Sequence, residues 1–173
     1  MGEVLDRVAS QQNLLDAWDA VRDSAYADGE AGQEVERFEA MAARRISEIA
    51  GALLAGTWRP SPAHHVKIAK PAGGVRHLAI APVEDRVVER AVLSEVDALV
   101  DPHLMPWSFG YRRGLGVDDA IRAMVEARDA GNTWVLRADI SKCFDEIPRW
   151  PVLEQLTEVC RDDDLVKLIR GLV

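Results

Sequence analysis

The sequence predicts a helix-rich α+β protein, in which a β-hairpin and one further strand supply the β structure. Three observations predict this class. Apolar residues recur at intervals of three and four in several long segments, a spacing typical of amphipathic helices. The runs HVKIAK and VRHLAI flank the turn PAGG, which indicates a β-hairpin. The apolar run TWVLRADI is typical of one more strand.

The bulk composition is that of one ordinary domain. The chain has 173 residues, of which 48% are hydrophobic and 29% charged, enough for a core and too apolar for general disorder. No apolar run is long enough to cross a bilayer, and the acidic start MGEVLDRVASQQ is not a signal peptide. Cys143 and Cys160 form no disulfide framework or CxxC motif. We therefore expect a reduced, cytoplasmic protein without a membrane partner.

The charge is unevenly distributed along the chain. The net charge is −8, which by itself argues against nucleic acid as a partner. Residues 1–56 contain 11 Asp/Glu against 5 Lys/Arg, whereas residues 57–128 contain 9 against 10, together with all four His. The acidic residues are therefore concentrated in the N-terminal third of the chain, and the region around 58–76 is locally basic. We expect this chain alone to bind nucleic acid only weakly.

The first half of the chain reads as helices followed by the hairpin. A weak helical pattern over 11–26 is interrupted by DGEAGQ, and a stronger helix begins at residue 34. Gly56 is a plausible end for that helix, and Pro60 and Pro62 prevent its continuation. Its apolar face comprises Val35, Phe38, Met41, Ala42, Ile46, Ile49, Ala50, Leu53 and Leu54.

The second half alternates helices with loops and the expected strand. Helices are predicted over 84–100, over 117–130 and from Pro148 to the last residue, with the acidic triplet 162–164 capping the final helix. The loop DPHLMPWSFGYRRGLG separates the first two helices. We expect Trp107, Phe109, Tyr111 and Trp134 to pack in the core. The last helix has no stop signal at its end, so the chain reads as cut rather than finished.

The octamer ADISKCFD, residues 138–145, places Asp139 at the end of the expected strand. A carboxylate there can reach into a cleft, where it would suit Mg²⁺, which prefers oxygen ligands. A two-metal site for phosphoryl transfer needs such an aspartate and a second carboxylate from elsewhere. The alternative is a solvated aspartate at a strand end. The octamer alone leaves both interpretations open.

Two further motifs carry positive charge. In KPAGGVR, Lys70 and Arg76 flank a turn whose glycines bring backbone N–H groups close to an anion, so they could hold a triphosphate. The alternative is a solvated basic turn. In SFGYRRGLG, Arg112 and Arg113 could contact a nucleic-acid strand, or belong to a structural loop. The pair His64 and His65 is not favoured as a metal site, because adjacent strand residues face opposite sides.

The order of these motifs resembles the reverse transcriptases of the group II intron lineage. The resemblance runs from about Trp58 to about Ile147 through KPxGGxR, the DRVV helix, SFGYR and DIxxCFD. It implies the fingers and partial palm of a right-hand polymerase. The implied parts are an acidic helical extension over 1–56, fingers over 57–132, and a truncated start of the palm over 133–173.

The resemblance also assigns roles to the residues of ADISKCFD. Asp139 is similar to the first catalytic aspartate, a metal ligand, and Ile140 would offer its backbone carbonyl to the second ion. Phe144 matches the aromatic steric gate, which excludes the 2′-OH of a ribonucleotide. Lys142 and Cys143 would lie along the triphosphate through their backbone.

The basic positions receive roles in the same way. Lys70 and Arg76 resemble the fingers residues that hold the phosphates of the incoming nucleotide. Arg86 and Arg112 lie in motifs associated with the fingers and the template path. The implied reaction is attack of a primer 3′-OH on a deoxynucleotide α-phosphate, with two Mg²⁺ ions and release of pyrophosphate. The implied partners are an RNA template, a DNA primer and deoxynucleotides.

One part of the family pattern is absent. The later motif, an aromatic followed by x-Asp-Asp, has no good counterpart, since 26–29 comes too early and 162–164 follows Asp139 too closely. We therefore expect the first part of a longer polymerase, lacking its C-terminal palm and thumb. The alternative is a non-catalytic nucleic-acid-binding or vestigial fragment. The acidic 1–56 favours a host-serving branch, such as enzymes working with a CRISPR integrase, but the branch stays open.

Overall fold

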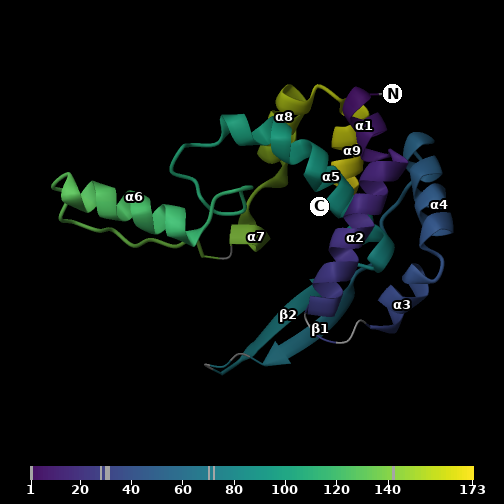
Figure 1. Ribbon diagram of the computed structural model, residues 1–173, viewed down its shortest axis with the longest axis horizontal. Coiled ribbons are helices and arrows are strands. Elements are labelled where there is room, and N and C mark those ends of the chain that lie inside the picture. Colours follow the sequence, from purple (N-terminus) through teal and green to yellow (C-terminus); the bar gives the residue numbers. More distant parts are fainter. Residues whose placement is uncertain (1, 28, 30–31, 70, 72, 142) are drawn as a thin grey trace.

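The computed structural model describes residues 2–27, 29, 32–69, 71, 73–141 and 143–173, and it confirms a helix-rich α+β fold (Figure 1). The described strands form one antiparallel hairpin, as the sequence predicts. The elements in chain order are α1 (Glu3–Val8), α2 (Gln11–Ala27), α3 (Gln33–Glu39), α4 (Ala42–Leu54), β1 (His64–Ala69), β2 (Val75–Ile80), α5 (Val83–Val100), the 3₁₀ turn η1 (Asp101–His103), α6 (Val117–Asp129), α7 (Cys143–Glu146), α8 (Arg149–Cys160) and α9 (Asp163–Leu172).

The helix predicted from residue 34 to 54 is two helices. α3 ends at Glu39, and Met41 adopts φ −128° and ψ 16°, which is not helical, before α4 begins. Before the break, the Phe38 ring of α3 packs on Trp18 of α2, with ring centroids 4.5 Å apart. The apolar spacing continues across the break, so the sequence pattern could not reveal it.

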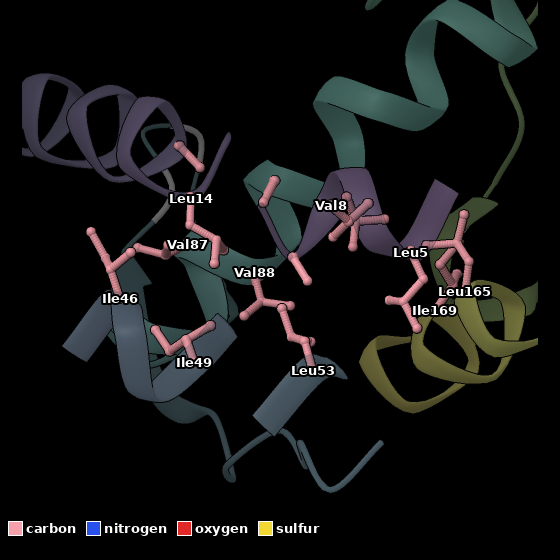
Figure 2. Close-up of a cluster of buried hydrophobic side chains, with 14 of the residues drawn as sticks. Leu5, Val8, Leu14, Ile46, Ile49, Leu53, Val87, Val88, Leu165 and Ile169 are labelled. Carbon is pink, nitrogen blue, oxygen red and sulfur yellow. The ribbon is translucent and has the colours of Figure 1, made fainter. Parts of the chain in front are cut away.

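The core is built around α5. Val83, Val87, Val88 and Ala91 on one face of α5 are completely buried, and each of the three valines contributes about 1.5–3 kcal/mol. Figure 2 shows that the surrounding side chains come from α1, α2, α4 and α9. The labelled members of this cluster are Leu5, Val8, Leu14, Ile46, Ile49, Leu53, Val87, Val88, Leu165 and Ile169.

The same cluster bears on the division of the chain into parts. Its members come from 1–56, from 57–132 and from 133–173. The acidic N-terminal helices are therefore packed into the core that also holds α5 and α9. The three boundaries themselves stay predictions.

The hairpin extends away from the helices (Figure 1). Its register pairs His64 with Ile80 and Ala69 with Val75. Both faces are exposed, since every residue of β1 is exposed and only one residue of β2 is partly covered. Gly73 and Gly74 have φ of +89° and +88°, a conformation that glycine adopts without strain.

The strand predicted over 133–140 is not formed, which corrects the sequence interpretation. The segment is extended but unpaired, and the side chains of Trp134 and Leu136 are 95% and 91% exposed. A strand needs the backbone of a neighbour, and β1 and β2 pair only with each other. The same finding overturns the core positions predicted for Trp134, Trp107, which is 70% exposed, and Tyr111, which is fully exposed.

The C-terminal region is two helices rather than one. Arg161 adopts the left-handed conformation, with φ 50° and ψ 38°, and separates α8 from α9. Asp162 then caps α9, because its Oδ1 accepts the Leu165 N–H at 3.0 Å. Its Oδ2 accepts the Leu5 N–H of α1 at 2.8 Å. The predicted acidic cap is confirmed, and it also joins the first and last helices.

None of the described helices combines the length and apolar character needed to cross a membrane.

Candidate functional site

Asp139 lies in the extended segment that precedes α7. Its side chain is exposed, and that of Ile140 is 70% exposed. Within the described part of the chain, no three His, Cys, Asp or Glu residues come together as a metal site. An exposed carboxylate suits a hard cation, but among the described residues Asp139 is the only carboxylate of the expected ligand set, and Ile140 would add only its backbone carbonyl. The described residues therefore do not assemble the two-metal site.

The residues expected along the nucleotide lie around α7. Cys143 begins this helix and is a half-buried free thiol. Lys142 lies outside the described residues, as does the side chain of Phe144, whose backbone belongs to α7. The triphosphate contacts and the steric gate therefore stay predictions.

Arg76 lies near the end of the hairpin, on β2. It is opposite Ile68 of β1, and its side chain is exposed. No carboxylate of the described residues forms an ion pair with it, so its guanidinium is available to an anion. Lys70, its expected partner, lies outside the described residues. The structure confirms the glycine turn between them but does not test the pair as a phosphate clamp.

Arg86 lies on α5 at the edge of a hollow between α2 and α5. This cavity of ≈ 490 Å³ is also lined by Ser24, Glu89 and Arg90. The Nε of Arg86 is buried without a hydrogen-bond partner among the described residues. Burial, with a contribution from the nearby Asp85 charge, raises the pKa of the Glu89 carboxyl. Two arginines one turn apart could receive an anionic group, which is compatible with the predicted template role.

The larger cavity lies elsewhere. It has a volume of ≈ 580 Å³ and lies between the end of α4 and α9, where Leu54, Trp58 and Lys167 contribute to its lining. None of the motif residues lines it. Cavity size therefore does not locate the expected chemistry.

Arg112 holds its own loop together. Its Nε donates to Asp101 Oδ1 at 2.6 Å and its second guanidinium nitrogen donates to Oδ2 at 3.0 Å. The remaining nitrogen donates to the carbonyls of Met105 and Ser108 at 3.1 and 3.0 Å. The neighbouring Arg113 is 72% exposed and reaches Asp97 at 3.2 Å. The template role of Arg112 stays a prediction, and these contacts agree with the alternative of a structural loop residue.

The Asp101–Arg112 pair predicts a pH dependence of stability. Hydrogen bonding to Arg112, aided by its charge, lowers the pKa of Asp101 below the ordinary 3.8. The stabilisation is therefore fully present above that value and is lost as the pH falls through the lowered pKa. In urea unfolding, we expect Asp101→Asn to be less stable than wild type at pH 7, and the difference to shrink as the pH falls below 3.8. A difference that stays constant over this pH range would contradict this.

Sequence reasoning missed two carboxylates at the base of the hairpin. Asp85 is 2% exposed, and its Oδ2 accepts the Ser61 N–H at 2.8 Å. Burial raises the pKa of Asp85, and the Ser61 N–H partly opposes this. Glu34 of α3 accepts the Val83 N–H at 2.9 Å. The available signal was the position of Asp85 in the first turn of α5, where carboxylates are favoured.

Comparison with known proteins identifies the class of this chain. The family profile for reverse transcriptases (RNA-dependent DNA polymerases) matches residues 68–169, a range that contains β2, α5 and ADISKCFD. The chain belongs to this family.

Its relatives confirm the resemblance to the group II intron lineage. The chain is 25% identical over 142 residues to the COX1/OXI3 intron 1 protein of Saccharomyces cerevisiae, covering 82% of this chain and 17% of that protein. It is 32% identical over 127 residues to YkfC of Escherichia coli, covering 71% and 33%. It is 25% identical over 126 residues to the group II intron-encoded protein LtrA of Lactococcus lactis, covering 72% and 21%.

The chain is short beside these proteins. It spans a third or less of the length of the curated relatives it matches. The match therefore assigns the chain to the RNA-directed DNA polymerase family. It does not establish the activity of a whole protein.

Proposed function

We propose that this chain is the fingers and first part of the palm of an RNA-directed DNA polymerase that works within a longer protein. The observation that carries this proposal is the family match over residues 68–169. The substrates would be deoxynucleotides, added to a DNA primer along an RNA template.

In this proposal the motif residues contact different parts of the substrates. Arg76, with Lys70, contacts the phosphates of the incoming nucleotide, and Phe144 excludes its 2′-OH. Arg86 contacts the template. The exposed Asp139 supports a role in holding a divalent cation, and its carboxylate together with nucleotide phosphates suits Mg²⁺. The remaining carboxylates would come from beyond this chain.

The second candidate is a nucleic-acid-binding fragment without catalysis. It applies if no further segment supplies the second carboxylate motif, because residues 1–173 contain one of the two family motifs that supply catalytic carboxylates. Primer extension separates the two candidates. A longer protein that contains this chain and a later aromatic-x-Asp-Asp motif should extend a DNA primer on RNA. A naturally complete 173-residue protein without such a segment or partner would favour the second candidate.

For the isolated chain we expect weak, salt-sensitive binding to an RNA–DNA hybrid and no primer extension. Contacts to phosphate release counterions, so affinity should fall as salt rises from 50 to 200 mM. Fluorescence anisotropy measures this. Arg86→Ala, which removes the proposed template contact, should reduce the salt slope by about one, whereas the control Arg44→Ala, whose guanidinium already pairs with Glu48 at 2.8 Å, should leave it unchanged. Binding independent of salt would contradict the expectation.

The finer biological role rests on one observation. The excess of acidic residues in 1–56 favours an enzyme with a function for the host cell over an intron maturase. An example is an enzyme that acts with a CRISPR integrase in the cytoplasm. Copurification of the longer protein with such an integrase would support that role. Association with intron RNA would instead place it among the intron-encoded relatives.

A further inference from the structure

The hairpin is joined to the helices by two short segments, here called its stems: residues 61–63 before β1 and residues 81–83 after β2. A carboxylate binds each stem. In the first stem, three residues before β1 begins, the Ser61 N–H donates to Asp85 Oδ2 at 2.8 Å. In the second stem, three residues after β2 ends, the Val83 N–H donates to Glu34 Oε1 at 2.9 Å. Both bonds join residues distant in sequence, and both stems meet at the first turn of α5.

The stems matter because the hairpin has little else to fix its direction. Val66, Ile68 and Ile80 remain 40%, 46% and 41% exposed, and the strands pack mainly against each other. A two-stranded hairpin gains little stability from itself in water. Its orientation relative to the helices therefore depends on how residues 61 and 83 are attached.

Asp85 makes the stronger of the two attachments. It is 2% exposed, and its Oδ1 has no hydrogen-bond partner among the described residues. Burying a carboxylate with one oxygen unpaired is unfavourable. The Ser61 N–H and the N-terminus of α5 offset that cost. An apolar residue would avoid the cost entirely, so the carboxylate serves the attachment rather than the core.

Glu34 connects the acidic N-terminal helices to the other stem. It lies on α3, which is fixed by the packing of Phe38 on Trp18. The next helix, α4, reaches α5 through Arg45 and Glu84, whose Nε and Oε1 are 3.8 Å apart. Glu34 is exposed, so its bond is more easily replaced by water than that of Asp85.

We propose that Asp85 and Glu34 are positioning residues for nucleotide binding, which together hold the hairpin at the angle at which Arg76 meets the nucleotide phosphates. This rests on the proposed function of the hairpin. Neither carboxylate contacts the nucleotide. The acidic N-terminal segment thus acts on the nucleotide through the stem that Glu34 holds.

The direction of the hairpin can be measured without any nucleotide. Spin labels at Val75 on the hairpin and Ser47 on α4, both exposed, report it after Cys143→Ser and Cys160→Ser remove the native thiols. We expect Asp85→Ala to broaden or shift the distance distribution, and Glu34→Ala to do so to a smaller extent. Asp85→Asn and Glu34→Gln retain an acceptor oxygen and should preserve it. The control is Glu36→Ala, since Glu36 is exposed on the same helix and bonds to neither stem among the described residues.

The second measurement is steady-state kinetics of the longer polymerase. Asp85→Ala and Glu34→Ala should raise KM for deoxynucleotides several-fold, with a smaller change in kcat and rescue by Asp85→Asn and Glu34→Gln. A distance distribution that is unchanged in both alanine variants would overturn the proposal. So would a changed distribution with an unchanged KM. If the wild-type protein fails to use deoxynucleotides, the proposed function falls, while the distance result still decides whether the carboxylates hold the hairpin.

Discussion

Replacement of Asp139 by alanine is expected to abolish primer extension by the longer polymerase, a loss on the order of 10³-fold or more. The side chain is exposed in the extended segment before α7, so it contributes little to packing. Among the described residues, it supplies the one carboxylate of the proposed cation site. Removing it should leave a folded protein that binds primer and template but does not join nucleotides.

The controls separate charge from fold. Asp139→Asn keeps the shape without the negative charge and should be equally inactive. Asp129→Ala removes another exposed acid, at the end of α6, and should retain activity. All three variants should unfold at the wild-type temperature in a circular dichroism melt. Substantial primer extension by Asp139→Ala would remove this residue from the site.

The helices were predictable because their signal is local. The apolar spacing over 83–100 and 117–129 is contained within each segment, so it needs no knowledge of what packs against it. The hairpin was predictable for a similar reason, since a glycine turn and its two flanking runs are adjacent in sequence. The break at Met41 was not, because it interrupts the backbone without interrupting the apolar face.

The extended segment over 133–140 shows the limit of local reasoning. TWVLRADI has the composition of a strand, but a strand exists only where another backbone lies beside it. That partner is a property of distant sequence. The exposure of Trp134 follows from the same cause.

Charged residues show this limit most clearly at the site. Arg112 and Arg113 are adjacent, yet the first is held inside its loop and the second is largely exposed. Asp85 and Asp162 read as ordinary surface acids or caps, and both are buried. Burial of an acid depends on which backbone N–H groups the fold brings to it. Motif order, by contrast, led to the family without any of this information.

Asp162 supports the second large prediction, which concerns stability. Its Oδ1 accepts the Leu165 N–H within α9, and its Oδ2 accepts the Leu5 N–H of α1, with the residue only 3% exposed. The carboxylate packs closely against Gly2, since a Cβ at that position would overlap it. Loss of an N-cap costs about 0.5–2 kcal/mol. An unsatisfied buried N–H costs about 1–3 kcal/mol more.

We therefore expect Asp162→Ala to lower the free energy of unfolding by about 1.5–5 kcal/mol, the sum of those two effects. This is a large share of the roughly 5–15 kcal/mol that is typical of a folded protein. Asp162→Ser keeps a capping oxygen for α9 but cannot reach α1, so it should lose about half as much. Asp163→Ala, which removes an exposed acid of the same turn, should cost less than about 1 kcal/mol. Urea unfolding at neutral pH measures all three, and an Asp162→Ala variant as stable as Asp163→Ala would show that the bond between the first and last helices contributes nothing.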